Sequence, residues 1–245
     1  MLKVIKIGGN IVDNPEKLEA FLNDFAHLSG KKILVHGGGK VATTISKALG
    51  IETQMIGGRR VTDEQTLKVV TMVYAGAINK TIVAGLQGRG CNAVGLSGAD
   101  GAFIRSVRRS PVPVDYGFVG DPESINSGLV KTLTDAGYII VAAPITYDPV
   151  AGGVLNTNAD TVAQTIATGM AETGEEVELV YCFEKKGVLS NVDDENSVIP
   201  KITEGDFEEL RSRGIVADGM LPKIENAFKA IRGARPDYGG TTLQK

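Results

Sequence analysis

The chain has 245 residues and a formal net charge of −3, with 42% hydrophobic and 22% charged residues. This length allows either one large α/β domain or two modest lobes around a sizeable core. The balance of charge shows no excess of Lys and Arg, which argues against nucleic acid as a partner. Cys91 and Cys182 lie far apart and form no CxxC pair, so neither a disulfide framework nor a zinc site is indicated.

Signals for membranes or secretion are not expected. No run approaches the roughly 18 to 20 apolar residues that a membrane span needs. The first ten residues, MLKVIKIGGN, lack the basic region, the long apolar core and the cleavage site of a signal peptide. We therefore predict a soluble, cytoplasmic protein.

In chain order, short apolar runs alternate with segments of helical period, which is typical of βαβ units and a largely parallel sheet. Strands are expected at 3–7, 32–36, 92–97, 138–144 and 177–183. Helices are expected at 15–30, 41–50, 63–90, 127–137, 160–171 and 218–231. Residues 101–126 predict a hairpin or looped excursion near the sheet edge. The charged stretch 172–176 is the candidate boundary within a single domain, 1–245, between lobes 1–172 and 173–245.

Two glycine turns follow predicted strands, one at Gly8 and Gly9 after Lys6, the other at 37–39 after His36. In an open parallel sheet, ligands bind beyond the carboxyl ends of strands, where helix N-termini point unpaired N–H groups outward. A single turn of this kind is explained by the chain reversal alone. Two of them, with a lysine beside the first, favour an anion site.

Spacing excludes three familiar sites. The Walker A pattern and the Rossmann GxGxxG are absent. A lipase-type oxyanion loop needs a GxSxG elbow and a second histidine, but Ser97 lacks that spacing and the remaining histidine, His27, falls inside a predicted helix. His36 closes a predicted strand and is assigned a structural role, either in packing or in a hydrogen bond that fixes the turn.

Polar side chains gather at two later junctions. Arg59 and Arg60 lie in a loop opened by glycines, and a guanidinium fork is a natural clamp for a carboxylate. Asn156, Asn158 and Asp160 lie at a strand-to-helix junction. Helix capping explains one of these three, which leaves the others as candidate ligand groups.

Lys223 follows a proline in a predicted helix, where a surface lysine is the simpler interpretation in isolation. Phosphoryl transfer, however, needs cations directed at an anionic transition state. Lys6 and Lys223 could supply two.

The ordered set of motifs resembles the amino acid kinase family, and most closely its branch that phosphorylates N-acetyl-L-glutamate. The motifs are KIGGN at 6–10, VHGGG at 35–39, GGRRVTD at 57–63, INK at 78–80, AVGLSGADG at 93–101, GFVGD at 117–121, LNTNAD at 155–160 and ADGMLPK at 217–223. Each is weak alone, but together they run through nearly the whole chain in family order.

The resemblance implies a three-layer α/β/α sandwich with a largely parallel open sheet, in which the N-terminal lobe binds the acyl amino acid and the C-terminal lobe binds ATP. It also implies transfer of the γ-phosphoryl group of ATP to the side-chain carboxylate of N-acetyl-L-glutamate, in arginine biosynthesis. Mg²⁺ would bridge the ATP phosphates with few protein ligands, and no metal-binding residue is expected.

Roles for residues follow from the same resemblance. Lys6, Lys223 and Asp160 would be catalytic, with Asp160 orienting the lysines. Gly38, Gly39, Arg60, Asn156 and Asn158 would bind the substrate, and Gly8, Gly9, Glu184 and Gly187 the nucleotide.

Departures from the family pattern leave more than one substrate open. Residues 182–189 read CFEKKGVL, so that Glu184 stands where relatives have Asp, and the chain after the lysine helix is short. Lys40 and Arg59 add positive charge near the substrate loops, which motivates a succinyl group in place of acetyl. The substrate could also be an aminoadipate derivative, or the chain could be a sensor without catalysis. The chain starts at its first predicted strand, which predicts a homodimer insensitive to arginine.

Overall fold

The computed structural model describes residues 1–182, 187–191, 193–215, 224–228 and 241–242. The strands in these ranges are β1 (Leu2–Ile7), β2 (Lys31–His36), β3 (Met55–Ile56), β4 (Arg59–Arg60), β5 (Ala93–Leu96), β6 (Ile104–Arg108), β7 (Gly120–Ile125), β8 (Ile139–Ala142), β9 (Ile145–Asp148), β10 (Gly153–Asn156), β11 (Val177–Cys182), β12 (Lys201–Ile202) and β13 (Thr241–Thr242). The helices are α1 (Gly9–Val12), α2 (Pro15–His27), α3 (Gly39–Ala48), α4 (Glu64–Thr71), η1 (Met72–Ile78), α5 (Asn79–Gln87), η2 (Asp100–Ala102), α6 (Ser127–Asp135), α7 (Ala159–Ala171) and α8 (Glu204–Ser212).

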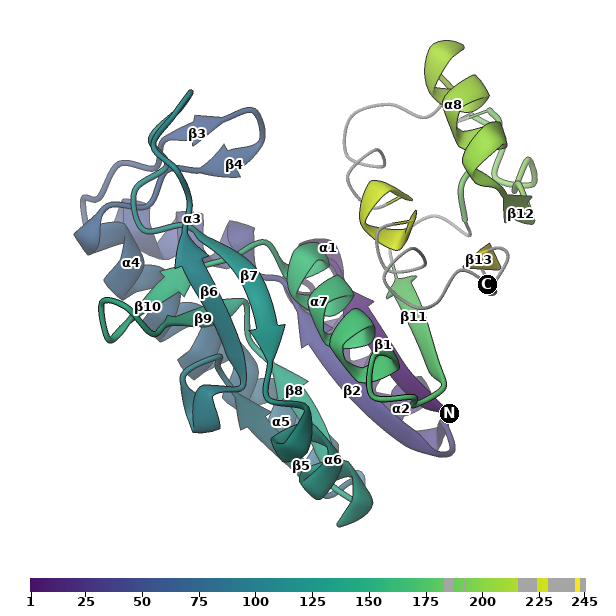
Figure 1. Ribbon diagram of the computed structural model, residues 1–245, viewed down its shortest axis with the longest axis horizontal. Coiled ribbons are helices and arrows are strands. Elements are labelled where there is room, and N and C mark those ends of the chain that lie inside the picture. Colours follow the sequence, from purple (N-terminus) through teal and green to yellow (C-terminus); the bar gives the residue numbers. More distant parts are fainter. Residues whose placement is uncertain (183–186, 192, 216–223, 229–240, 243–245) are drawn as a thin grey trace.

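The five strands predicted from apolar runs form one parallel sheet, in the order β11-β1-β2-β8-β5. Helices cover both faces of this sheet (Figure 1). The predicted α/β class and the largely parallel sheet are confirmed. The strand after the candidate boundary, β11, pairs with β1, so the sheet runs across residues 172–176.

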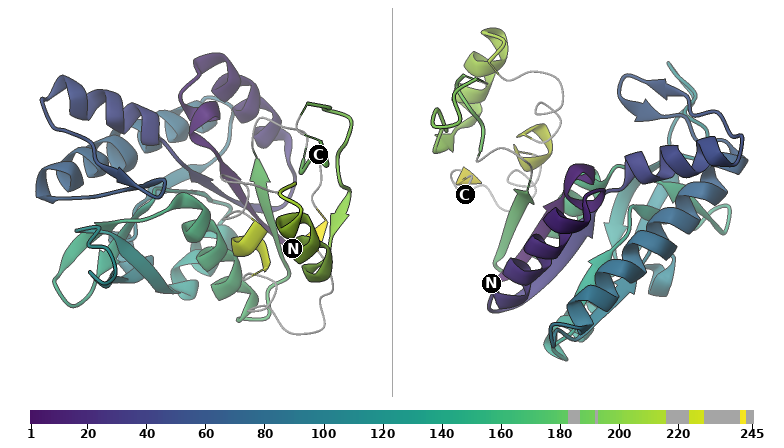
Figure 2. Two further views of the ribbon diagram at one scale, coloured as in Figure 1. Left: turned by 90° about the horizontal axis from the view of Figure 1, so that it is seen from above. Right: turned by 180° about the vertical axis from the view of Figure 1, so that it is seen from behind.

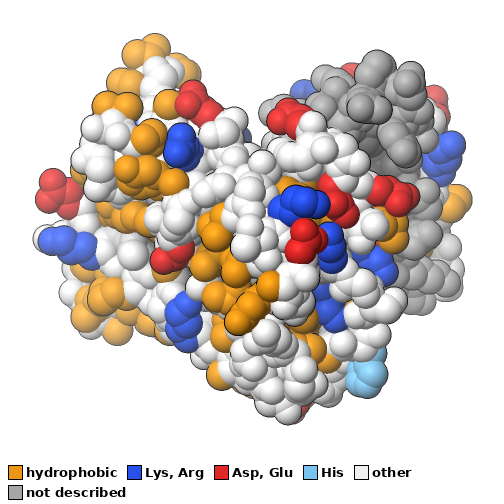
Figure 3. All heavy atoms as spheres, turned by 60° about the horizontal axis from the view of Figure 1, so that its bottom comes forward, with side chains coloured by type: hydrophobic (Ala, Val, Ile, Leu, Met, Phe, Trp, Pro, Cys, Tyr) orange, Lys and Arg blue, Asp and Glu red, His pale blue; other side chains and the backbone are white. Residues whose placement is uncertain are grey.

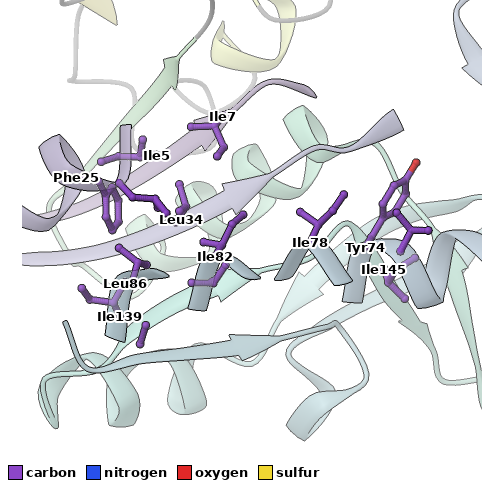
Figure 4. Packing of buried hydrophobic residues seen from close by; sticks show 14 of the residues in the cluster. Ile5, Ile7, Phe25, Leu34, Tyr74, Ile78, Ile82, Leu86, Ile139 and Ile145 are labelled. Carbon is purple, nitrogen blue, oxygen red and sulfur yellow. The ribbon is translucent and has the colours of Figure 1, made fainter. Parts of the chain in front are cut away.

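Alternating side chains divide the core into two layers. On β1, Ile5 and Ile7 pack with α2 and the long helix of α4, η1 and α5, whereas Leu2 and Val4 pack with α6 and α7. Figure 4 shows the first layer, in which Leu34 of β2 lies among side chains of that long helix. Lys6 follows the alternation of Val4, so its side chain lies on the α7 face.

A second, four-stranded sheet was not predicted. Its order is β10-β9-β6-β7, and it contains the β6–β7 hairpin within the predicted excursion at 101–126. The hairpin is confirmed, but β9 and β10 were missed. The apolar run at 138–144 was predicted as one strand, and β9 begins directly after it. In the structure Pro144 separates β8 from β9, and β9 leaves the parallel sheet to pair with β10.

The helix predicted at 63–90 exists as α4, η1 and α5, and its middle seven residues are π-helical. Glu64–Gln87 is also long and apolar enough to cross a membrane, with a mean hydropathy of 1.4 over its best window. One helix of this kind is weak evidence for a membrane span, and Asn79 and Lys80 interrupt its apolar residues. Val70, Ile82 and Leu86 of this helix are fully buried in the core, and a core helix meets the same criterion.

The C-terminal part has a small core of its own. Val188, Ile202, Phe207, Ile224 and Phe228 are buried together. Thr203 and Asp206 cap α8 reciprocally. Figure 1 and both views of Figure 2 show α8 and β12 beyond the β11 edge of the sheet. The helix predicted at 218–231 lies mostly outside the described residues, which include a helical segment at 224–228.

Candidate active site

A buried ion pair lies at the carboxyl end of the sheet. Lys6 Nζ, on β1, lies 2.6 Å from Asp160 Oδ1 in the first turn of α7. The two residues are 6% and 5% exposed. Taking two charges out of water costs several kcal/mol for each ion, which their mutual attraction repays only when the geometry is good. The pair lies at the carboxyl end of a parallel sheet, where ligands bind. Because its burial costs free energy, we consider it a candidate catalytic pair.

The backbone of α7 fixes Asp160. Asn158 caps this helix, and its Oδ1 accepts hydrogen bonds from the N–H groups of Asp160 (2.8 Å) and Thr161 (3.2 Å). Tyr181 Oη, on β11 beside Lys6, donates to the Asp160 carbonyl at 3.0 Å. Burial, with the Asp160 carboxylate nearby, raises the pKa of Tyr181, so the phenol stays protonated. Asn158, predicted to bind substrate, is thus observed as a cap.

Two short turns bring the N-termini of α1 and α3 together. A Cβ on Gly9 would lie 4.0 Å from the backbone nitrogens of both Gly38 and Gly39. Neither helix has a side-chain cap at its N-cap residue, Gly8 or Gly38. The first N–H groups of a helix have no partner within that helix. Two such termini facing one space could accept an anion, so the anion site that the two glycine motifs predicted stays a prediction with a geometry that allows it.

Arg60 lies beside the second turn and is 9% exposed. Its Nη2 donates to the Gly39 carbonyl at 2.9 Å and to Thr43 Oγ1 at 2.8 Å. Its Nη1 donates to Thr53 Oγ1 at 3.1 Å. A guanidinium has five N–H donors, so these bonds fix its plane and leave capacity for a carboxylate.

Asn156 ends β10 and bonds to two segments outside that strand. Its Nδ2 donates to Thr62 Oγ1 at 3.0 Å, and its N–H donates to the Phe118 carbonyl at 2.9 Å. Thr62 follows Arg60 closely in the chain. The structure thus connects Asn156 to the segment that carries Arg60.

Lys40, expected to add free positive charge, is already engaged. Its Nζ donates to Asn10 Oδ1, and its charge acts on the nearby Asp13. Burial raises the pKa of Asp13, against the lowering effect of Lys40. The other added cation, Arg59, is exposed on the β3–β4 hairpin. The charge argument for a longer acidic acyl group is weakened accordingly.

The predicted site residues therefore fall into three groups. Those at the carboxyl end of the parallel sheet and the adjoining helix starts are Lys6, Gly8, Gly9, Gly38, Gly39, Arg60, Asn156, Asn158 and Asp160. Gly187 lies in the C-terminal part, where a Cβ would come within 2.8 Å of Val198 Cγ1, so packing favours a glycine there. Lys223 and Glu184 lie outside the described residues.

Sequence reasoning missed several neighbours of the glycine turns, among them Asn10, Asp13, Tyr74 and Asn79. Tyr74 and Asn79 come from the long helix, and Figure 4 shows the ring of Tyr74 in the core with its hydroxyl directed outward. The polar Asn79 within an apolar helix at 72–86 was a signal that could have been used.

The described residues were compared with two kinds of binding site, a metal site and a basic nucleic-acid surface. In the ranges that the structure describes, no three His, Cys, Asp or Glu side chains are placed to hold a metal ion. Figure 3 shows acidic and basic side chains interspersed on one face, with exposed hydrophobic side chains among them. This face carries no continuous basic surface of the kind that binds nucleic acid.

Comparison with known proteins gives the family. The profile of the amino acid kinase family matches residues 1–237. The chain belongs to the amino acid kinase family. It is 55% identical over 230 residues to the acetylglutamate kinase of Bacteroides thetaiotaomicron, covering 94% of this chain and 89% of that protein. It is 53% identical over 255 residues to the acetylglutamate kinase of Bacteroides fragilis, covering 100% of this chain and 97% of the relative.

The fold agrees with that of solved structures. The structure of smu.665 from Streptococcus mutans superposes with a TM-score of 0.77 at 25% identity, over 95% of this chain and 91% of the other. The names of the curated relatives do not favour a succinylated or aminoadipate substrate, nor a sensor without catalysis.

Proposed function

We propose that this member of the amino acid kinase family transfers the γ-phosphoryl group of ATP to the side-chain carboxylate of N-acetyl-L-glutamate, as the names of its curated relatives indicate. The observation that carries the proposal is the buried Lys6–Asp160 pair beside two uncapped helix N-termini. Lysine and converging N–H groups are the donors that a migrating phosphoryl group needs.

The reaction needs little from the protein except alignment and positive charge. A carboxylate is already an ionised nucleophile, so no general base is required. Two anions, the acyl carboxylate and the γ-phosphate, repel one another as they approach. Lys6 is proposed to offset that repulsion, and its ion pair with Asp160 supports this role by holding the ammonium in one position. Lys223 is proposed as the second cation, from the resemblance alone.

The substrate side is assigned to Arg60. The carbonyl of Gly39 and the hydroxyl of Thr43 orient its guanidinium beside the glycine turn. A fork held in this way can grip the α-carboxylate of an acyl amino acid while Gly38 and Gly39 offer N–H groups to the transferring phosphoryl group. Asn156, which is bonded to Thr62 near Arg60, and Asn158 at the start of α7 are proposed as further substrate-binding residues.

The nucleotide is assigned to Gly8, Gly9, Glu184 and Gly187, the first two at the N-terminus of α1. When bound with ATP, Mg²⁺ would supply charge neutralisation at the β- and γ-phosphates. Because the described residues offer no cluster of metal ligands, the ion would be held mainly by those phosphates.

The deciding experiment is an ATP-consumption assay with hydroxylamine trapping of the acyl phosphate. N-acetyl-L-glutamate, N-succinyl-L-glutamate and N-acetyl-L-aminoadipate are compared in parallel. We expect the highest kcat/KM for N-acetyl-L-glutamate. A higher kcat/KM for either of the other two acids would reject N-acetyl-L-glutamate as the preferred substrate. If no acyl phosphate is trapped with any of the three acids, phosphoryl transfer to a carboxylate is rejected.

We also propose a cytoplasmic homodimer that L-arginine does not inhibit. Met72 of the long helix is 57% exposed, so one large apolar side chain is available there to a second copy. Light scattering should give twice the chain mass, and the mass should not depend on arginine. A monomer or a hexamer would contradict this assembly.

A further inference from the structure

The glycine turn at 37–39 rests on the π-helical part of the long helix. Gly38 has φ 150° and ψ 21°, a conformation that side chains rarely allow. A Cβ there would collide with Ile78 Cδ1 and lie 3.4 Å from Tyr74 Cδ1. Both contact residues belong to η1. Segments of this kind are rare and occur frequently at functional sites.

The residue that follows η1 is polar and completely buried. Asn79 Nδ2 donates to the Val141 carbonyl on β8 at 2.9 Å and lies 3.2 Å from His36 Nε2 on β2. Its Oδ1 accepts a hydrogen bond from Lys80 Nζ at 3.1 Å. A Cβ on Gly95 of β5 would collide with the same oxygen. The Asn79 amide therefore fits among three neighbouring strands.

The hydrogen bonds determine the tautomer of His36. Its Nδ1 lies 2.9 Å from the Gly37 carbonyl, which can only accept, so Nδ1 carries the proton. Nε2 is then the acceptor for the Asn79 amide. Burial lowers the pKa of His36 to about 4, and the cation of Lys80 also lowers it, whereas the bond to Gly37 raises it. The imidazole is neutral at physiological pH.

The π segment explains how these contacts coexist. One extra residue in an α-helix rotates every later side chain by about 100°. Here this rotation lets Tyr74 and Ile78 face the glycine turn, and Asn79 face His36. Ile82 and Leu86, further along the helix, still face the core. The long helix thus holds the turn at Gly38 and, through the imidazole, at Gly37.

We propose that Asn79 and His36 are positioning residues for phosphoryl transfer. Asn79 fixes the imidazole, and the Nδ1–H group of His36 holds the Gly37 carbonyl. Because that carbonyl lies in one peptide plane with the Gly38 N–H group, this sets the direction of the Gly38 N–H group. Neither side chain contacts the reacting groups. The inference rests on the proposed function of the same site, and it concerns how the anion site is held open rather than which substrate enters.

Asn79→Asp gives a test that a merely structural role would not pass. A carboxylate can only accept, so neutral His36 would turn its proton to Nε2 and leave Nδ1 facing the Gly37 carbonyl without a hydrogen. Doubly protonated His36 could donate a hydrogen bond from Nδ1 to the Gly37 carbonyl and another from Nε2 to the new carboxylate at position 79. We therefore compare the kcat/KM of the variant for N-acetyl-L-glutamate with that of the native chain. The ratio of the two values should fall about tenfold as the pH rises from about 6 to about 9. A ratio that is constant across this range would overturn the proposal.

A second pair of variants covers the case in which Asn79→Asp does not fold. In His36→Asn the amide nitrogen can take the place of Nδ1 and donate to Gly37, whereas in His36→Gln the amide reaches the Nε2 position instead. We expect kcat to be about tenfold higher for His36→Asn than for His36→Gln at similar melting temperatures. Equal turnover, or the reverse order, would overturn the proposal. A native chain without kinase activity would instead reject the proposed function itself.

Discussion

Lys6 Nζ and Asp160 Oδ1 lie 2.6 Å apart, and the side chains of both residues are 7% exposed. One belongs to the first strand and the other to a helix more than 150 residues later, so the complete fold is needed to make the pair. Burying such a pair costs free energy, which is best explained by a catalytic role for the two side chains. Its position beside the two glycine turns connects the charge to the anion site.

Removing one member of this pair should destabilise the chain strongly. In Asp160→Ala the Lys6 ammonium stays buried without its carboxylate, and we expect the free energy of unfolding to fall by about 3 kcal/mol. Urea unfolding gives the value. The double variant Lys6→Met with Asp160→Ala should recover part of the loss, because no uncompensated charge remains. A loss below about 1 kcal/mol in the single variant would speak against a tightly coupled pair.

Arg60→Lys should separate substrate binding from nucleotide binding. Lysine lacks the planar fork that reaches the Gly39 carbonyl, Thr43 and Thr53 together. The KM for N-acetyl-L-glutamate should rise about tenfold or more, while the KM for ATP changes little. The neighbouring Arg59→Lys is the matched control, because Arg59 is exposed, and it should behave as the native chain does. Equal effects of the two substitutions would contradict the assigned role.

Gly38 and Gly39 should respond differently to alanine. A methyl group on Gly38 would meet Ile78 and require an unfavourable φ of 150°, so Gly38→Ala should lower the melting temperature. A methyl group on Gly39 meets no heavy atom within 4 Å, so Gly39→Ala should fold normally. It should nevertheless raise the KM for substrate, since the methyl group would project into the proposed binding space. Unchanged kinetics in Gly39→Ala would place the substrate elsewhere.

Asp13→Asn should make the chain more stable at neutral pH. Both carboxylate oxygens of Asp13 are buried and make no hydrogen bond of ordinary geometry with the described residues, and burial raises its pKa above the model-peptide value of 3.8. A raised pKa in the folded state means that stability is greatest while the group is protonated and falls as pH rises through that pKa. The gain in melting temperature should therefore be largest near neutral pH and should disappear below about pH 4. A gain that does not depend on pH would contradict this origin.

The sequence predicted the parallel sheet well, because its strands are apolar runs bounded by glycine turns at which the chain must reverse. It also predicted that Lys6, Gly9 and Gly38 share one edge, since parallel strands end on the same side. It did not predict β9 and β10, because the run at 138–144 does not reveal that Pro144 ends one sheet and the next begins. Local propensity contains no information about such a transfer between sheets.

The support behind the site was also hidden from the sequence. The π segment depends on packing against Gly38, and the Asn79–His36 contact joins residues 43 positions apart. His36 was given a structural role, in packing or in fixing the turn, and the structure shows it buried and bonded to Gly37, but its partner Asn79 was not identified. Long-range polar contacts of this kind have no periodicity and therefore leave no pattern along the chain.

The most direct test of phosphoryl transfer at this site is the turnover of Lys6→Ala under saturating ATP and N-acetyl-L-glutamate. Lys31→Ala is the matched control, because Lys31 forms a partly exposed ion pair with Asp135 far from the glycine turns. If Lys6 stabilises the transition state, kcat should fall at least about a hundredfold while the KM values change only a few-fold. A folded Lys6→Ala variant that turns over at nearly the native rate would contradict the central claim.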